Sequence, residues 1–464
     1  MSTLIKNGII LTSEGEYKAD VLIQDEKIAL IGADLECQAD EVVDATGKYV
    51  MPGAIDNHSH FGLPFQGTTT ADCTTSHAAV VGGTTTIVDF VPQPVGMGLI
   101  EAYKLHRSTK FEGICTPDFA FHAMVQDRTD KMFEEIPLLP ENGISTIKLF
   151  MAYKGSENYC DDSTVLRAMQ EAKKTGVTLM VHAESADITD MLQKQLVAAG
   201  CLEPKYHAVS RPPVVETECI QRVICLARVA ESPVFVVHVA AAEAMETLRN
   251  AANTGFPIYG ETCPQYISLS VDNLAKPGFE GAKYVCSPAL REASNHDHIL
   301  EALDKGWLQV FASDHSAFKF KGQKDMGLGD FTKIPNGAPG VQHRLHVLWT
   351  KGVATGKVKK NRFVDVCCTA PAKFNGLYPQ KGAILVGSDA DIIIFDPDYR
   401  GTITLADTFE GLDFTPYEGM EQIGRCDRVY IRGRLMAEKG QLVGAKGEGK
   451  FIESKPYGAA YTGL

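Results

Sequence analysis

Short apolar runs alternate with longer helix-like stretches through the middle of the chain, and this alternation constrains the fold more than any other feature. The apolar runs include 84–91 (TTTIVDFV), 145–153 (STIKLFMAY) and 234–240 (VFVVHVA), and helical patterns such as 162–176 and 216–231 lie between runs of this kind. Strands that alternate with helices imply βα units and a parallel sheet. Roughly seven or eight such units predict an α/β protein built on a (β/α)8 barrel.

Both ends of the chain have a different, β-rich pattern. Residues 1–51 consist of short apolar runs separated by turns, with Asn7-Gly8 as a hairpin-type dipeptide, and the same texture returns in 376–445. We expect these two pieces to meet in one small β-sandwich beside a barrel at 52–375. The last segment, 446–464, has little core-forming pattern. We expect it to be an arm that contacts a neighbouring subunit or is disordered.

Five segments place a candidate metal ligand at or just beyond the end of an apolar run. The carboxyl ends of parallel strands form the rim where α/β barrels build active sites. Imidazole and carboxylate groups are ligands of zinc and related ions. Alternate residues that leave a strand point the same way, so both imidazoles of an H-x-H can reach one ion. The pattern predicts a metallohydrolase, with the candidate ligands His58, His60, Lys148, His182, His238 and Asp314.

Lys148 is the unusual member of this set. It lies among apolar residues in STIKLF, where a bare charge is costly. A desolvated lysine has a lowered pKa and becomes a nucleophilic amine, and its reaction with carbon dioxide gives an anionic carbamate that can bridge two metals. Taken alone, a lysine that reaches solvent or pairs with an acid is the more common arrangement.

Further polar residues lie beside the candidate ligands. Asp314 in ASDHS can bind one metal and move a proton from water to a leaving nitrogen. Its neighbour His315 is a weaker candidate, because consecutive strand residues face opposite ways. Glu184 and Glu261 are either acids that orient imidazoles or exposed side chains, and the sequence leaves both alternatives open.

Composition argues against several other classes of protein. The formal net charge is −13 and no stripe of Lys and Arg is present, so we expect no nucleic-acid partner. We expect no membrane span and no signal peptide, because the chain lacks a run of 18 apolar residues and a basic segment followed by a long apolar stretch. The twelve cysteines are scattered without a C-x-x-C, which favours a cytoplasmic protein.

Several longer motifs carry a family resemblance. PGAIDNHSHF, GGTTTIVDF, IKLFMAYKG, GETCPQY, ASDHSAF and DFTKIPNGAPGVQHR are similar to motifs of the cyclic amidohydrolases, specifically the dihydropyrimidinases and bacterial D-hydantoinases. The resemblance extends from about residue 3 to 455. It implies a (β/α)8 barrel with a β-sandwich made from both termini, a binuclear zinc site and a homotetramer.

The resemblance also assigns the metal ligands. The first of two zinc ions is expected to bind His58, His60 and Asp314, and the second is expected to bind His182 and His238. A carboxylated Lys148 and a hydroxide are expected to bridge the two ions. Asp314 would also carry the proton to the departing ring nitrogen.

Substrate contacts follow from the same resemblance. Tyr153 is expected to hydrogen-bond the developing oxyanion, while main-chain groups of Ser287 and Asn336 hold the amide edges of the ring. The expected pocket for the exocyclic substituent is formed by Leu63, Phe65 and Phe150, of which the first two are equally well explained as loop packing. The implied reaction opens a dihydropyrimidine or a 5-substituted hydantoin to an N-carbamoyl amino acid.

Other proteins that resemble this chain suggest alternative functions. Dihydroorotases and allantoinases carry an arginine shortly after H-x-H, whereas 61–67 (FGLPFQG) contains no cation and favours an uncharged ring. The collapsin-response mediator proteins share the fold but lack key ligands and act as scaffolds; all six ligand positions are filled here, which favours an enzyme. One departure is Ala71-Asp72-Cys73, where relatives often have two acids followed by an aromatic residue.

Overall fold

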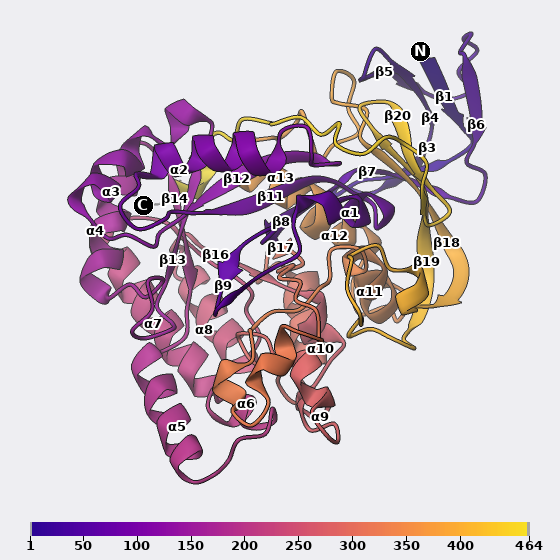
Figure 1. The fold of residues 1–464 in the computed structure, drawn as a ribbon. Helices are drawn as coiled ribbons and strands as arrows, with labels where there is room; N and C mark the ends of the chain where they lie inside the picture. The colour runs from indigo at the N-terminus through magenta and orange to yellow at the C-terminus, as the bar shows by residue number, and fades with distance from the viewer. Residues whose placement is uncertain (1, 462–464) are drawn as a thin grey trace.

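The computed structural model describes residues 2–461. Within this range, eight parallel strands pair with their neighbours in chain order and form the centre of the molecule (Figure 1). The ring closes beyond its last strand, because the main-chain N–H of His60 donates to the carbonyl of His315 at 2.9 Å. This closure confirms the predicted (β/α)8 barrel. The strands are β8 (Ala54–Ser59), β11 (Thr84–Pro92), β12 (Asp118–Met124), β13 (Thr146–Phe150), β14 (Thr178–His182), β15 (Val234–Val236), β16 (Ile258–Thr262) and β17 (Val310–Phe311).

Helices connect the strands and cover the outside of the barrel (Figure 1). In α4 (Asp162–Lys173), Val165, Ala168, Met169 and Ala172 are buried, which is the spacing of one apolar helix face. The Asp161 side chain begins this helix by accepting a hydrogen bond from the N–H of Thr164 at 2.8 Å. The other helices are α1 (His77–Val81), α2 (Leu99–His106), α3 (Asp130–Glu135), α5 (Ala186–Ala198), α6 (Tyr206–Val209), α7 (Pro213–Ala230), α8 (Ala242–Ala252), α9 (Val271–Leu274), α10 (Asn295–Lys305), α11 (Arg344–Leu348), α12 (Lys360–Val364) and α13 (Ala370–Phe374).

Two further sheets lie beside the barrel and contain strands from both ends of the chain (Figure 1). Strand β18 pairs antiparallel with β7, placing Ile392 opposite Pro52, and the two sheets share a core that includes Ile5, Val50 and Ile394. The predicted sandwich from both termini is confirmed. One sheet contains β5 (Lys27–Gly32), β4 (Asp20–Gln24), β1 (Ser2–Lys6) and β6 (Glu41–Asp44). The other contains β21 (Gln441–Leu442), β20 (Arg434–Glu438), β19 (Glu421–Ile431), β18 (Ile392–Thr402), β7 (Tyr49–Pro52), β2 (Ile9–Leu11) and β3 (Glu16–Lys18).

Asn7-Gly8 does not form a hairpin. The preceding strand β1 pairs with β4 and β6, whereas the following strand β2 pairs with β3 and β7 in the other sheet. Asn7 has φ of 63°, so the dipeptide supplies the left-handed backbone that such a sharp change of direction needs. The turn therefore carries the chain from one sheet of the sandwich to the other.

The C-terminal segment requires a correction. Residues 449–455 pack on their own chain: the N–H of Phe119 donates to the carbonyl of Lys450 at 3.0 Å, and the N–H of Ile452 donates to the carbonyl of Phe119 at 2.8 Å. The Phe451 ring lies 5.9 Å from that of Phe121 in a stacked arrangement. Because Phe119 is near the start of β12, the segment lies across the N-terminal end of the barrel. Contact with a second subunit stays a prediction, and residues 462–464 lie outside the described residues.

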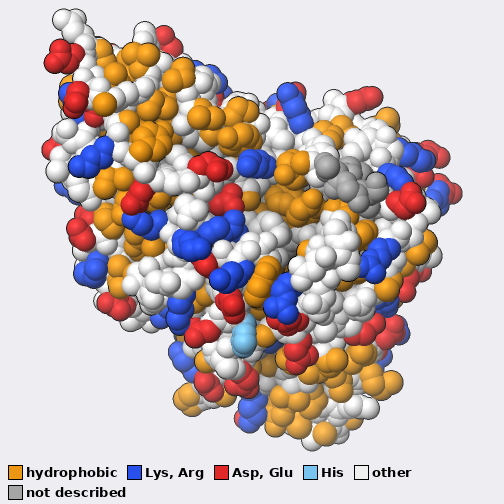
Figure 2. Space-filling view, turned by 180° about the vertical axis from the view of Figure 1, so that it is seen from behind, with side chains coloured by type: hydrophobic (Ala, Val, Ile, Leu, Met, Phe, Trp, Pro, Cys, Tyr) orange, Lys and Arg blue, Asp and Glu red, His pale blue; other side chains and the backbone are white. Residues whose placement is uncertain are grey.

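On the surface, acidic and basic side chains are interspersed. Figure 2 shows this mixture on the face opposite to the view of Figure 1, together with apolar patches between the charged groups. Among residues 2–461, none of the helices has both the length and the apolar character needed to cross a membrane.

Candidate metal centre and substrate pocket

The six candidate ligands converge at the carboxyl end of the barrel strands. His58 lies on β8, Lys148 on β13 and His182 at the end of β14, while the others follow a strand by one to three residues. Every one of the six side chains is buried. Strand geometry therefore brings together residues up to 256 positions apart in sequence, from His58 to Asp314. The six residues are His58, His60, Lys148, His182, His238 and Asp314.

Three of these residues form a compact group that can hold a metal ion. The Nε2 atoms of His58 and His60 are 3.1 Å apart. Asp314 Oδ1 lies 3.1 Å from His58 Nε2 and 3.6 Å from His60 Nε2. Two imidazole nitrogens and one carboxylate oxygen at such short separations are a typical donor set for zinc.

The Lys148 amine borders this group. Its Nζ atom lies 2.8 Å from His58 Nε2 and rests over the rings of Phe90 and Phe150. The side chain is 1% exposed, so it does not reach solvent. Burial lowers the pKa of Lys148 to about 8, although the nearby Asp314 carboxylate opposes this shift. The amine is therefore much easier to obtain in its neutral, nucleophilic form than an ordinary lysine.

His182 and His238 form the opposite side of the cluster. Their ring centroids are 4.4 Å apart, and the His238 ring lies 5.4 Å from that of His58. His238 Nδ1 is buried without a hydrogen-bond partner within residues 2–461. A buried imidazole nitrogen in this state is suited to metal coordination, since a cation would satisfy its lone pair.

Buried carboxylates orient two of the imidazoles. Glu261 accepts a hydrogen bond from His58 Nδ1, and Glu184 Oε2 lies 2.8 Å from His182 Nε2. Both acids are fully buried, which settles the alternatives that the sequence left open. Because Nδ1 of His58 is engaged, its Nε2 lone pair faces the cluster, as metal-binding histidines require.

Arg211 is a part of the site that sequence reasoning missed. Its Nη1 donates to Glu184 Oε2 at 2.9 Å, and both side chains are buried. Burial alone would raise the pKa of Glu184, but Arg211 and His182 together hold it well below its usual range. Arg211 lies in the loop between α6 and α7, away from the apolar runs, so no strand-end pattern points to it.

The electrostatics of the cluster favour a bound cation. Burial, with the Lys148 charge as a further cause, lowers the pKa of His58 and His60, and burial likewise lowers that of His238. Neutral imidazole is the form that binds metals. Burial also raises the pKa of Asp314 to about 7, a shift that a metal ion would reverse by stabilising the carboxylate. The residues present therefore fit a metal centre.

Three site residues have a left-handed backbone. The φ angles of Tyr153, His238 and Asp314 are 61°, 41° and 49°. L-residues other than glycine adopt this region rarely, and such strain gathers at functional sites. Each of the three residues lies two or three positions beyond the end of its strand.

The predicted substrate residues lie around a pocket beside the metal ligands. Leu63, Phe65 and Phe150 line it together with Tyr153, and they belong to one apolar cluster. Asn336 Nδ2 donates to the hydroxyl of Ser287 at 3.0 Å. Sequence reasoning missed further lining residues, namely Met124, Asn158, Ser316 and Gly337.

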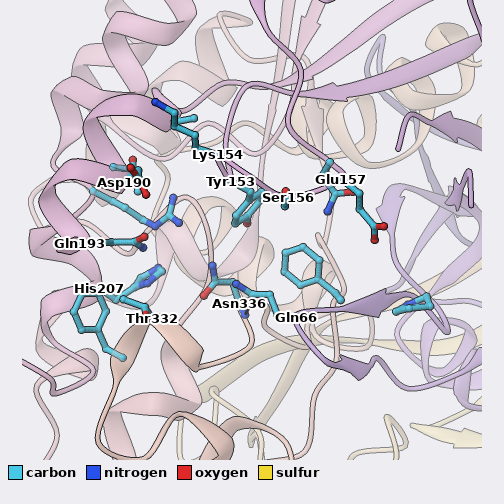
Figure 3. Close-up of a pocket in the computed structure, with 17 residues that line it drawn as sticks. Gln66, Tyr153, Lys154, Ser156, Glu157, Asp190, Gln193, His207, Thr332 and Asn336 are labelled. Carbon is cyan, nitrogen blue, oxygen red and sulfur yellow. Dashed lines mark hydrogen bonds between the residues drawn. The ribbon is translucent and has the colours of Figure 1, made fainter. Parts of the chain in front are cut away.

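An outer chamber adjoins this pocket (Figure 3). Tyr153, Phe65 and Asn336 line both spaces and therefore lie at the boundary between them. Gln66 reaches into the chamber and accepts a hydrogen bond from the main-chain N–H of Asn336 at 2.7 Å. Burial raises the pKa of Tyr153 to about 12, which keeps its hydroxyl protonated and able to donate at neutral pH.

Residues 49–436 match the amidohydrolase family. The chain belongs to this family. It is 45% identical to the D-hydantoinase of Geobacillus stearothermophilus, over 99% of this chain and 98% of that protein, and 42% identical to the D-hydantoinase of Streptomyces coelicolor, over 97% of each. It is also similar to the crystal structure of a dihydropyrimidinase from Brevibacillus agri, with a TM-score of 0.96, 43% identity and coverage of 98% and 99%.

Proposed function

We propose that the protein hydrolyses the amide bond of an uncharged ring, a 5,6-dihydropyrimidine or a 5-substituted hydantoin, to an N-carbamoyl amino acid. The observation that carries this proposal is the cluster of buried metal-binding groups beside a pocket of mixed apolar and amide-binding character. The relatives named D-hydantoinase and dihydropyrimidinase support the same reaction.

We propose two zinc ions as the cofactor. His58, His60 and Asp314 would hold one, His182 and His238 the other, and Lys148 as its carbamate would bridge them. Support comes from the neutral imidazoles and from the buried amine 2.8 Å from His58 Nε2. When bound, the ions supply Lewis acidity and lower the pKa of water to near neutrality.

The protein's own groups then perform the remaining steps. The Asp314 carboxylate takes the proton of the attacking water and delivers it to the departing ring nitrogen. The Tyr153 hydroxyl donates to the oxyanion that develops on the attacked carbonyl, a contribution of roughly 3–4 kcal/mol for a well-placed donor. Both groups border the same pocket, which supports these roles.

Main-chain groups at two loops would bind the amide edges of the ring. Within residues 2–461, the N–H and C=O of Ser287 and the C=O of Asn336 make no hydrogen bond, whereas the N–H of Asn336 is taken by Gln66. Buried polar groups need partners. A cyclic amide, which offers both N–H donors and C=O acceptors, would satisfy them. Leu63, Phe65 and Phe150 would surround the exocyclic substituent.

The stretch 61–67 contributes no cation to the pocket. Arg211 lines the outer chamber, but its guanidinium is engaged by Glu184 at 2.9 Å. A ring that carries a carboxylate would therefore meet, at these positions, only a cation that is already paired with Glu184. This supports an uncharged ring over a dihydroorotate-like substrate.

The central test is the loss of ultraviolet absorbance of dihydrouracil with zinc-loaded protein in bicarbonate. Ring opening is expected with the wild type and lost, together with metal, in Lys148→Ala. The exposed Lys174→Ala serves as the matched control. Ring opening undiminished in Lys148→Ala would refute the bridging carbamate. If two zinc ions are bound and dihydrouracil does not react, a hydantoin becomes the expected substrate.

We also propose a homotetramer in the cytoplasm. The location is supported by all twelve cysteines being free thiols in the structure, and the assembly by the family resemblance alone. Sedimentation of the purified protein measures the assembly: a species near four times 50.4 kDa is expected, and a monomer would contradict the proposal.

A further inference from the structure

Lys324 is a fully buried lysine outside the metal centre. It begins the short 3-10 helix Lys324–Gly327 and has 0% relative exposure. Its amine donates to the main-chain carbonyl of Val285 at 2.8 Å and to that of Pro335 at 2.9 Å. A lysine is costly to bury, so two hydrogen bonds to carbonyl groups at this depth call for an explanation.

The two carbonyls belong to the two loops proposed to bind the ring. Val285 is two residues before Ser287, and Pro335 immediately precedes Asn336. A direct hydrogen bond also joins the loops, from the N–H of Gly337 to the carbonyl of Val285 at 3.1 Å. The amine thus lies between the loops and binds both of them.

The two loops are held together by individual hydrogen bonds, not by regular secondary structure. Residues 285–288 and 334–337 lie outside the helices and strands, so their spacing is not set by a ladder of hydrogen bonds. The Ser287 and Asn336 side chains meet at 3.0 Å, which shows how close the two segments are. A shift of one loop by about 1 Å would misplace the groups that face the ring.

We infer that Lys324 is a positioning residue that fixes the main chain of Ser287 and Asn336 at the separation required to bind both amide edges of the ring. This inference rests on the proposed function. Lys324 does not touch the pocket; it acts through the carbonyls of Val285 and Pro335.

The arrangement does not depend on the charge of the amine. Burial lowers the pKa of Lys324 to about 7. A neutral amine keeps two N–H groups, which is the number that the two carbonyls require. Both bonds can therefore persist across the pH range in which the enzyme would work.

The test compares steady-state kinetics of Lys324→Met with the wild type, using zinc-loaded protein and dihydrouracil. Methionine fills the space but donates no hydrogen bond. If the two loops bind substrate and transition state equally, KM rises about ten-fold and kcat changes less than about three-fold. Bound zinc should be unchanged, because Lys324 contacts none of the candidate ligands.

A second variant and a control complete the experiment. Lys324→Gln keeps an amide donor, and a smaller rise in KM is expected. Lys321→Met removes an exposed lysine from the same segment and should behave as the wild type. A KM within two-fold of the wild type for Lys324→Met would overturn the inference. Failure of both Lys324 variants to fold would overturn it too, since the residue would then serve stability.

These outcomes are distinct from a failure of the proposed function. If the wild type opens neither dihydrouracil nor a hydantoin while two zinc ions are bound, the proposed function fails. If the wild type is active and the Lys324 variants match it, only the inference about Lys324 fails.

Discussion

Glu261→Gln should weaken metal binding while leaving the fold intact. The Glu261 carboxylate accepts from His58 Nδ1 and also from Asn57 Nδ2, the latter at 3.1 Å. Burial raises the pKa of Glu261 to about 8, and a bound cation would favour its charged form. The charged carboxylate strengthens the bond to His58 and makes its Nε2 a better ligand.

The expected magnitude follows from these two hydrogen bonds. Replacing a charged acceptor by a neutral one reduces a hydrogen bond by about 1–1.5 kcal/mol, which is about ten-fold in affinity. The glutamine NH2 must also face Asn57 Nδ2, which is another donor. Asn57 is not free to rotate its amide, because its Oδ1 accepts from Asn375 Nδ2 at 2.6 Å. A loss of 10–100-fold in zinc affinity is therefore expected.

Competition between apo-protein and a chromophoric zinc chelator measures this affinity. Glu243→Gln, an exposed position on α8, is the matched control and should bind zinc as the wild type does. A zinc affinity of Glu261→Gln within three-fold of the wild type would refute the argument that this carboxylate tunes His58.

Three further outcomes are expected. At fixed dissolved carbon dioxide, reactivation of metal-free protein by zinc should accelerate about ten-fold per pH unit below pH 8 and level off above it, because only neutral Lys148, with its pKa of about 8, forms a carbamate. Arg211→Met should lower the free energy of unfolding in urea by about 3–5 kcal/mol, because it removes the arginine partner of the buried Glu184 carboxylate. Phe451→Ala should cost ~2 kcal/mol in the same assay, about half the value for a fully buried phenylalanine, because this ring is partly exposed.

Controls make these outcomes decisive. Reactivation that does not depend on pH would contradict the role of neutral Lys148. Lys173→Met breaks an exposed ion pair with Glu231 and should change the unfolding free energy by less than about 1 kcal/mol. If Arg211→Met is no more destabilising than this control, the buried Arg211–Glu184 pair does not stabilise the fold as proposed. An unchanged unfolding curve for Phe451→Ala would mean that the C-terminal segment adds no stability.

The barrel and the position of the candidate ligands at its rim could be predicted from the sequence, because both depend on local pattern. Apolar runs that alternate with helices leave little choice of topology, and a residue that follows a strand must lie at its carboxyl end. His58, Lys148 and Asp314 could therefore be placed near one another although they are far apart in the chain. Their convergence within hydrogen-bond distance is what the structure adds.

Features that depend on long-range packing could not be predicted in the same way. The dipeptide Asn7-Gly8 has hairpin composition, but the sheet that each flanking strand joins decides its role. Lys324 lies in a short 3-10 helix and Arg211 in a loop, and in neither segment does a periodic pattern mark a buried residue. The segment 449–455 is weakly patterned because its main chain, rather than an apolar face, attaches it to β12.

The left-handed backbone at Tyr153, His238 and Asp314 has a consequence for selection. Each such residue costs roughly 1–2 kcal/mol relative to glycine, and a whole domain has a net stability of only about 5–15 kcal/mol. A laboratory search for heat-resistant variants would therefore select substitutions at these positions. Glycine there would relieve strain but remove the group that the proposed reaction needs. If the selected variants keep all three side chains, the search has selected for activity as well as for stability.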